Sequence, residues 1–354
     1  MNRILANDFL EISKHIKNKD QFKNTKWVIT GSTGMIGSYL VSFLSWFNKE
    51  FLNHSLSIIA TYRNELNAFH PILKEIYSDK LINFKKIDVG TEFDLPELKF
   101  VDFVIHTASN AAPQSYISDP IGTINANIRA TEYILDQLKD SVYLKSFLYI
   151  SSGEIYGNPS LENVPTRETY IGETDHLSLR SCYVESKKFA ETICYNYYRT
   201  FNIPVTMVRP IHVYGPGFKE NDSRVWADFI IKATKENHIE ILGDGTPRRG
   251  FCYISDAILQ MINVLVYGRP GEAYNIGNSH HISIKDLANV VAASCSRSVS
   301  VYVKNELPEY LKTSPQISCP DMKKTSELGK LFSTDIEVGI ARTISWYQNP
   351  DEMM

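Results

Sequence analysis

Short runs of apolar residues alternate with longer segments of helical periodicity along most of the chain. The apolar runs predict buried strands at 27–30, 57–61, 81–87, 101–105, 147–150 and 204–209. Between them, apolar side chains recur every three or four residues at 39–47, 123–138 and 183–194, which predicts helices that cover a sheet. Strands that alternate with helices in this way predict an α/β fold with a doubly wound parallel sheet.

The two ends of the chain depart from this alternation. Residues 1–24 predict an amphipathic leader helix that packs on the edge of the core. After residue 203 the pattern loosens into helices at 224–231 and 284–293 and short strands at 239–242 and 273–277. We therefore expect a leader helix, a nucleotide-binding domain at 25–203 and a smaller C-terminal α/β lobe at 204–354. The boundary is soft, because the chain is expected to cross between the two parts more than once.

A glycine-rich turn joins the first predicted strand to the first predicted helix. Gly31 permits a tight turn, Gly34 lets the backbone approach a pyrophosphate, and Gly37 lets the helix pack close to the strand. The N-terminus of the helix then faces the anion. The spacing of the glycines is three and three rather than the commoner two and three. We predict a Rossmann-type dinucleotide site whose cofactor contacts include Gly31, Thr33, Gly34, Met35, Ile36 and Gly37.

The ends of the next strands refine this prediction. An NAD enzyme usually ends its second strand with an acidic residue that holds the ribose 2′-hydroxyl, but here Arg63 follows that strand. Arg63 suits a 2′-phosphate or is simply a solvated loop residue, so NAD is expected and NADP is possible. Asp88 and Val89 follow the third strand, where Asp88 can touch the adenine. Ala108 follows the fourth, where a small side chain allows close approach to the cofactor. The segment 113–120 predicts a loop.

Tyr183 and Lys187 carry the chemistry expected at this sheet. They lie four residues apart in a predicted helix, so their side chains project from one face. An ammonium beside a phenol lowers the pKa of the tyrosine, so the pair can exchange a proton with a sugar or alcohol hydroxyl. Ser152 follows the fifth strand, and ligands bind at the carboxyl ends of parallel strands. Taken alone, a solvated Tyr–Lys pair is an equally good interpretation of this spacing.

Composition and charge narrow the possible partners. The 354 residues are 43% hydrophobic and 22% charged, as in an ordinary globular protein. A net charge of −3 gives no reason to expect nucleic acid or an anionic membrane as a partner. The five cysteines form no disulfide framework or zinc motif, and we expect a cytoplasmic protein. Phosphate binding then depends on local sites such as Arg248 and Arg249, which suit a diphosphate.

Together these motifs resemble the extended short-chain dehydrogenase/reductases that act on nucleotide sugars, the epimerase/dehydratase family. The likeness covers about residues 25–340. It implies a catalytic triad of Ser152, Tyr183 and Lys187, in which Lys187 also holds the cofactor ribose, and it places Glu154 beside this triad. It further implies that the substrate is a nucleoside-diphosphate sugar. The residues matched to its binding are Arg180, His212, Arg224 and Arg249, with Arg249 on the diphosphate.

Besides the missing acidic residue at the end of the second strand, two positions depart from the family pattern. His212 stands where the family usually has a diphosphate-binding asparagine, and Gly153 stands where the 4,6-dehydratases have an aspartate before the conserved glutamate. The segments 106–120 and 180–187 also look like those of UDP-glucuronate decarboxylases. However, a substrate-side arginine of that group is not matched around 318–321.

The resemblance implies oxidation of the sugar at C4 with a retained nicotinamide cofactor, while Tyr183 takes the hydroxyl proton. The 4-keto group then acidifies C5, where Glu154 is placed to act. NDP-hexose 4,6-dehydratase chemistry ranks first, because a plain 4-epimerase needs no carboxylate near C5. The alternatives are 4-epimerisation, UDP-glucuronate decarboxylation with Arg180 as the cation for the carboxylate, and NADPH-dependent reduction of a keto-sugar.

The helices predicted at 123–138 and 183–199 carry apolar residues on more than one face. In the family that the chain resembles, the equivalent helices pair across a two-fold axis into a four-helix bundle. We therefore predict a homodimer.

Overall fold

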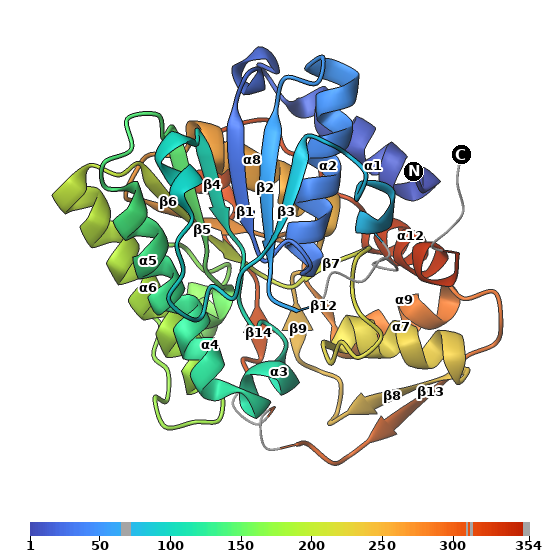
Figure 1. Ribbon diagram of the computed structural model, residues 1–354. Helices are drawn as coiled ribbons and strands as arrows, with labels where there is room; N and C mark the ends of the chain where they lie inside the picture. The colour runs from blue at the N-terminus through green and yellow to red at the C-terminus, as the bar shows by residue number, and fades with distance from the viewer. Residues whose placement is uncertain (65–71, 309–310, 312–313, 350–354) are drawn as a thin grey trace.

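The centre of the molecule is a seven-stranded sheet with the strand order β11-β6-β5-β4-β1-β2-β3, in which every neighbouring pair is parallel (Figure 1). This computed structural model describes residues 1–64, 72–308, 311 and 314–349. The strands are β1 (Lys26–Thr30), β2 (Ser57–Tyr62), β3 (Ile82–Lys86), β4 (Phe103–His106), β5 (Ser146–Ile150), β6 (Val205–Pro210) and β11 (Ala273–Ile276). The order reverses between β1 and β4, which marks the point where ligands bind to open α/β sheets.

Helices cover both faces of this sheet, as the apolar runs predicted. On one side lie α1 (Arg3–His15), α2 (Met35–Phe51) and α8 (Ile254–Tyr267), and on the other lie α4 (Pro120–Asn127), α5 (Arg129–Leu138) and α6 (Ser181–Phe201) (Figure 1). In β1, Trp27 and Ile29 join the core under the first group of helices, while Val28 joins the core under the second. Strands buried on both faces are apolar at consecutive positions, which explains the continuous runs in the sequence.

The leader helix α1 belongs to the core rather than to its periphery. It packs against α2 and α8, and Phe9 and Ile12 are fully buried. Its Asp8 is also buried and accepts hydrogen bonds from the hydroxyls of Tyr39 and Tyr253, at 3.0 and 2.8 Å. Arg342 of α12 (Ile336–Gln348) donates to the same carboxylate at 2.9 Å. Burial raises the pKa of Asp8 to about 6, although these partners oppose the rise.

The second lobe is built from small sheets and helices beside the carboxyl ends of the central strands. Two short parallel pairs join β7 (Val213–Tyr214) to β10 (Cys252–Tyr253) and β8 (His238–Leu242) to β13 (Ser300–Lys304). A three-stranded sheet places β9 (Arg248–Arg249) between β12 (Ile282–Ser283) and β14 (Ile317–Ser318). The helices are α7 (Val225–Lys235), α9 (Ile284–Ala293), α11 (Lys323–Ser326) and α12.

Several elements differ from the predictions. The helix predicted at 123–138 is two helices, α4 and α5, interrupted at Ile128. The segment 113–120 is not a loop, because residues Pro113–Ser118 form the short helix α3, followed directly by α4. Each of these helices begins with proline, whose missing N–H needs no partner at a helix start. Short 3-10 turns lie at Asp20–Phe22, Leu73–Glu75, Pro96–Phe100, Gly153–Tyr156 and Leu161–Asn163.

The last two strands of the central sheet, β6 and β11, follow residue 203, as does α8. The central sheet therefore contains strands from both sides of the domain boundary that the sequence analysis placed after residue 203. Among the helices in the described ranges, none combines the length and the apolar character needed to cross a membrane.

Candidate active site

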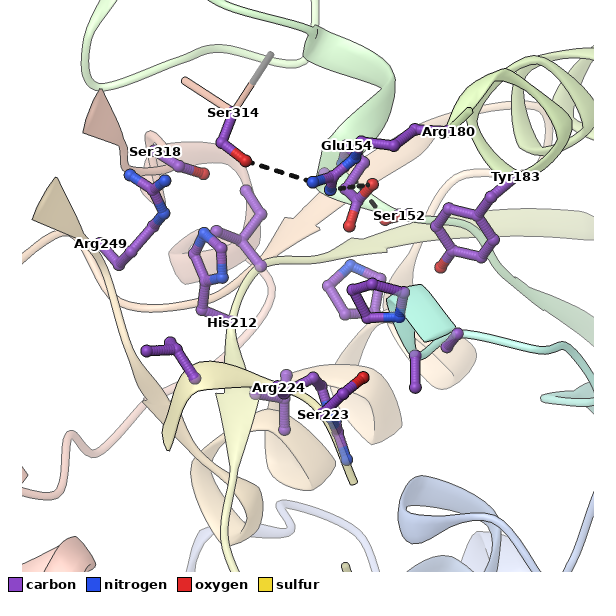
Figure 2. A pocket seen from close by; sticks show the side chains of 18 of the residues that line it. Ser152, Glu154, Arg180, Tyr183, His212, Ser223, Arg224, Arg249, Ser314 and Ser318 are labelled. Atoms are coloured by element: carbon purple, nitrogen blue, oxygen red, sulfur yellow. Dashed lines mark hydrogen bonds and ion pairs between the residues drawn. The ribbon is translucent and has the colours of Figure 1, made fainter. Parts of the chain in front are cut away.

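A cavity of about 1000 Å³ opens at the carboxyl ends of the central strands, where the sheet meets the second lobe. Side chains from both parts of the molecule converge on it (Figure 2). The predicted site residues that line it are Gly34, Met35, Ile36, Gly37, Arg63, Ser152, Glu154, Arg180, Tyr183, Lys187, His212, Arg224 and Arg249. The structure therefore brings all the predicted catalytic and substrate-binding residues to one place.

The glycine turn has the shape that a dinucleotide requires. Gly31 has a φ of +67°, and a Cβ there would lie 2.7 Å from Cα of Ala108 at the end of β4. A Cβ on Gly37 would lie 2.3 Å from the Gly31 carbonyl oxygen. Only glycine fits either position, and the resulting close packing leaves the N-terminus of α2 facing the cavity at Gly34 and Met35. The residues present therefore fit the phosphates of a dinucleotide.

Five of the predicted cofactor contacts lie outside the cavity lining, namely Gly31, Thr33, Asp88, Val89 and Ala108. Gly31 and Ala108 pack closely against each other, because a Cβ on Gly31 would lie 2.7 Å from Cα of Ala108. Asp88 is exposed and its Oδ1 accepts a hydrogen bond from the Gly90 amide at 2.9 Å, so it closes its own turn. Arg63 is exposed at the rim, where its Nη2 donates to Oδ1 of Asn110 at 3.4 Å. The cofactor contacts of these residues stay predictions.

Ser152 and Tyr183 meet at the end of β5. Ser152 caps the 3-10 turn Gly153–Tyr156, and its Oγ accepts a hydrogen bond from the Glu154 amide at 3.2 Å. Tyr183 lies in the first turn of α6, and its ring stacks on that of Tyr116 with centroids 5.0 Å apart. Burial raises the pKa of Tyr183, the negative Glu154 adds to the rise, and the hydrogen bond with Ser152 opposes it.

Lys187 is buried one turn further along α6, and its Nζ donates to the Ile150 carbonyl oxygen at 2.6 Å. Burial lowers the pKa of Lys187 to about 7. The structure does not show the predicted effect of Lys187 on the tyrosine, because the pKa of Tyr183 is raised rather than lowered. The reason is that burial disfavours the charged form of both groups, and Lys187 Nζ lies 5.9 Å from the centre of the tyrosine ring.

Glu154 and Arg180 form an ion pair at the centre of the cavity, with Arg180 Nη2 2.6 Å from Glu154 Oε2. Arg180 Nη1 also donates to Oγ of Ser314 at 3.2 Å, which ties the pair to the C-terminal segment (Figure 2). The neighbouring Gly153 leaves no room for a side chain, because a Cβ there would lie 2.2 Å from Cγ1 of Ile211. The turn 153–156 therefore contributes a single carboxylate, that of Glu154, and this carboxylate is paired with the guanidinium of Arg180.

Arg249 is buried on β9 at the far end of the cavity, and its Nη1 donates to the carbonyl oxygens of Arg248 and Gln316 at 2.8 and 3.4 Å. Within the described residues, no ion pair includes Arg249. Burial and the neighbouring Arg180 lower its pKa to about 10. Arg224, by contrast, is ion-paired with Asp222 and lies over the ring of Trp226. Arg249 is therefore a buried cation of the cavity that no described carboxylate neutralises.

His212 adopts a φ of +45°, which is strained for a residue with a side chain. Its Nε2 is buried and has no hydrogen-bond partner in the described part of the chain. Burial, and then the guanidinium groups of Arg249 and Arg180, lower the pKa of this imidazole. The His212 side chain is therefore neutral. A neutral imidazole can donate a hydrogen bond to an anionic ligand without adding charge.

Sequence reasoning missed two residues that line the cavity, Ile211 and Ser314, and it also missed Tyr116, which stacks on Tyr183 from outside the lining. Tyr116 lies on α3, and Pro113 at the start of that helix was the signal that could have revealed it. The contacts of Ile211 and Ser314 arise from tertiary packing and leave no local signal. No cluster of three or more metal-ligating side chains occurs in the parts of the chain that the structure describes.

Comparisons with known proteins identify the family of the chain. The model of the NAD dependent epimerase/dehydratase family matches residues 27–277. UDP-glucuronic acid decarboxylase 1 of Arabidopsis thaliana is 30% identical over 328 residues, covering 92% of this chain and 71% of the plant protein. UDP-glucuronic acid decarboxylase 3 of the same plant is 30% identical over 305 residues, covering 86% of this chain and 83% of its own length.

Solved structures share the fold. The UDP-glucuronic acid 4-epimerase of Bacillus cereus superposes with a TM-score of 0.77 at 24% identity, covering 92% of this chain and 99% of that one. The dTDP-glucose 4,6-dehydratase of Streptomyces venezuelae superposes with a TM-score of 0.76 at 22% identity, covering 92% and 97%. This chain belongs to the NAD dependent epimerase/dehydratase family. Its cofactor is NAD, as the sequence analysis expected, although the glycine turn by itself predicted only a dinucleotide site.

Proposed function

We propose that the protein oxidises a nucleoside-diphosphate hexuronate at C4 and releases its carboxyl group as CO₂. The observation that carries this proposal is the exclusion of a side chain at Gly153 by Ile211. Elimination of water across C5–C6 needs an acid for the C6 hydroxyl in addition to a base at C5. The dehydratases that the sequence resembles place an aspartate at this position. Decarboxylation needs no such acid, so it ranks above the dehydratase chemistry that the sequence favoured.

The residues of the site suit each requirement of this reaction. NAD, when bound, supplies the hydride chemistry. Tyr183 takes the proton of the C4 hydroxyl, Ser152 orients that oxygen, and Lys187 holds the cofactor ribose and can stabilise the tyrosinate. With C4 a ketone, the hexuronate is a β-keto acid. The C5–C6 bond breaks, its electron pair moves toward the C4 oxygen as CO₂ leaves, and C5 then takes a proton, which Glu154 is placed to relay. The C4 ketone would then regain the hydride from the reduced cofactor and the proton from Tyr183, so the net change is the replacement of the carboxyl group by hydrogen.

The charges of the cavity suit an anionic sugar nucleotide. Arg180 lies beside the turn that carries Ser152 and Glu154, where the carboxylate of a hexuronate would reach it. Arg249, which is buried at the other end of the cavity, is proposed to bind the diphosphate, with His212 and Arg224 beside it. The curated relatives at 30% identity are named for UDP-glucuronic acid, which supports the same class of substrate.

A second candidate is epimerisation of the same hexuronate at C4. Ser318 supports it, because it occupies the segment in which the decarboxylases carry a further substrate-side arginine. The residue lies on β14, in register with Arg249 of β9. Without that arginine, the substrate carboxylate has fewer cations to hold it in place for loss of CO₂.

Purified protein incubated separately with UDP-glucuronate, UDP-glucose and dTDP-glucose distinguishes these reactions. We expect the mass of one CO₂ to be lost from UDP-glucuronate alone. A product of unchanged mass with altered H4 coupling in its NMR spectrum would assign epimerisation. Loss of water from either neutral hexose would overturn the proposal in favour of a dehydratase, and consumption of NADPH with a keto-sugar would favour a reductase. Tyr183→Phe is the matched inactive control.

A further inference from the structure

A single guanidinium joins helix α6 to the turn 153–156. Arg209 lies near the end of β6 and forms a forked ion pair with Glu191 of α6, in which its Nε and Nη2 donate at 3.0 and 2.7 Å. Its Nη1 donates to Oη of Tyr156 at 3.0 Å and to the carbonyl oxygen of Glu168 at 2.8 Å. Because a guanidinium presents several N–H donors in a fixed plane, this one side chain holds both partners at once.

Glu191 places the ion pair on the face of α6 that carries the catalytic pair. Tyr183, Lys187 and Glu191 follow one another at intervals of four residues, and side chains at that spacing project from one face of a helix. We call this the catalytic face of α6. A carboxylate held by two parallel N–H donors has a defined orientation as well as a defined distance. Arg209 therefore fixes the catalytic face against the end of β6.

Tyr156 carries the contact from Arg209 into the turn 153–156, which also bears Glu154. Tyr156 is buried, and its hydroxyl accepts a hydrogen bond from Arg209 and donates one to Oδ1 of Asn275 on β11 at 2.7 Å. Asn275 is buried as well, and its amide nitrogen donates to two backbone carbonyl oxygens, at 2.9 and 3.0 Å. The phenol is therefore held between a donor and an acceptor that are themselves anchored.

The turn 153–156 is too short to absorb a shift of Tyr156 without moving Glu154. It is a 3-10 turn of four residues, and Glu154 lies two positions before Tyr156. Gly157 follows with a φ of +62°, and its amide donates to the Glu154 carbonyl oxygen at 3.1 Å. A Cβ on Gly157 would lie 2.0 Å from the carbonyl oxygen of Glu173, so the exit of the turn is closely packed. A displacement of Tyr156 would therefore reach the backbone of Glu154.

Ser152 depends less on this network. Its neighbour Ser151 donates from the backbone amide to the Val208 carbonyl oxygen at 2.8 Å, which continues the pairing of β5 with β6 up to the turn. Tyr183 is held separately, by the stack of its ring on Tyr116. Loss of the contact at Tyr156 should therefore displace Glu154 more than the two groups that act on the C4 hydroxyl.

We propose that Arg209 is a positioning residue that fixes Glu154 relative to the catalytic face of α6. It acts through Glu191 on the helix side and through Tyr156 on the turn side, and neither Arg209 nor Glu191 lines the cavity. The inference rests on the proposed function, because that function assigns Glu154 the proton at C5. It separates the two halves of the reaction, since the network of Arg209 supports protonation at C5 rather than oxidation at C4.

Two variants of the NAD-loaded enzyme test the proposal. Arg209→Lys keeps a positive charge beside Glu191, but an ammonium cannot reproduce the fork that also reaches Tyr156. Tyr156→Phe leaves the ion pair in place and removes only the hydroxyl. We expect each variant to lower kcat for UDP-glucuronate by about 10–100-fold, as a small misplacement of a reacting group does, and to leave KM nearly unchanged.

Reduced nicotinamide that accumulates during turnover is the signature of a displaced Glu154. If protonation at C5 is slow while oxidation at C4 continues, return of the hydride is delayed and the near-ultraviolet absorbance of the reduced cofactor rises. Glu154→Gln is the reference for this signal, and both variants should reproduce it. Arg342→Lys is the matched control, because it alters the ion pair with the buried Asp8, outside the cavity lining, and should give no such signal.

The possible failures can be told apart. Variants that turn over at the wild-type rate, or that slow turnover without accumulating reduced nicotinamide, overturn the role of Arg209 and leave the proposed function intact. An equal signal from Arg342→Lys also overturns that role, because the effect would then follow from general destabilisation. A wild-type enzyme that releases no CO₂ from UDP-glucuronate, or a Glu154→Gln variant without the signal, overturns the function proposed for Glu154 and the inference with it.

Discussion

Gly153 and Ile211 are packed so closely that only one of them can carry a side chain. A Cβ on Gly153 would lie 2.2 Å from Cγ1 of Ile211 and 2.9 Å from its Cδ1. Ile211 follows β6 directly and is itself buried, so it has little space into which to move. This relationship between two strand ends shapes the turn on which the catalytic chemistry depends.

Gly153→Asp should therefore destabilise the protein. Overpacking a tight site costs about 1–3 kcal/mol, and burying a carboxylate adds to it. The companion variant Gly153→Asp/Ile211→Ala makes room for the new side chain and should recover part of the loss. Denaturant unfolding of both variants and of Ile211→Ala alone measures the coupling. A single Gly153→Asp variant as stable as the wild type would show that Ile211 moves aside freely.

Tyr183→Phe should remove the general acid/base and leave the fold unchanged. The ring keeps its stack on Tyr116, so thermal stability should be preserved. Loss of a positioned acid/base lowers rates by about 10²–10⁴-fold. Steady-state turnover, with NAD binding as the control, checks this expectation. Wild-type turnover in the variant would contradict the proposed role of the phenol.

Lys187 should make the stability of the ligand-free protein depend on pH above neutrality. Its pKa falls from 10.5 to about 7 on folding, so between these values the unfolded chain binds more protons than the folded one. The contribution of Lys187 to stability is then fully present above pH 10.5 and is lost as the pH falls toward 7. Denaturant unfolding across this window should give a steeper rise with pH for the wild type than for Lys187→Met. Parallel curves would mean that the lysine keeps an ordinary pKa in the folded state.

Arg249→Met should have opposite effects on stability and on ligand binding. The guanidinium is buried without an ion-pair partner in the described part of the chain, so an apolar side chain of similar length should stabilise the ligand-free protein. The same change should weaken UDP binding by about 10–100-fold, because a charge-assisted hydrogen bond to the diphosphate is lost. Thermal melting and calorimetry with UDP measure the two effects. Unchanged UDP affinity would remove Arg249 from the nucleotide site.

The exposed faces of α4 and α6 should form the interface of a homodimer. Ile121 is 66% exposed, Phe189 is 54% exposed and Tyr195 is 44% exposed, although all three are large apolar side chains. Such a patch on two adjacent helices suits an isologous contact with a second copy. Light scattering should give twice the mass of the chain, and Phe189→Glu should give a monomer. A wild-type monomer at micromolar concentration would count against the dimer.

The strands were predictable because both faces of the sheet are covered. The burial of consecutive residues, such as Trp27, Val28 and Ile29, produces an apolar run that needs no tertiary information. Helix α8 was not predicted from the sequence. Its residues from Ile254 to Leu265 are all buried, including the polar Asp256, Gln260 and Asn263, so the helix lacks the solvent-exposed charged face that marks a surface helix.

The site was predictable as a set of motifs but not as an arrangement. Local spacing identified Tyr183 and Lys187 as neighbours on one helix face. The direction of the Tyr183 pKa was predicted wrongly, because it depends on burial and on Glu154, which lies 29 residues earlier in the chain. The ion pair of Glu154 with Arg180 likewise exists only once the loop between them has folded back over the sheet.

The buried pairing of Asp8 with Arg342 bears on the order in which the chain can fold. These residues lie 334 positions apart, so the contact closes a loop that includes nearly every element described above. Closing so long a loop is slow and entropically costly until the intervening parts are in place. During synthesis, Asp8 is made before all three of its partners, and Arg342 is the last of them to follow. The guanidinium that pairs with the buried Asp8 is therefore absent until α12 has been synthesised, so the surroundings of α1 are completed late in folding.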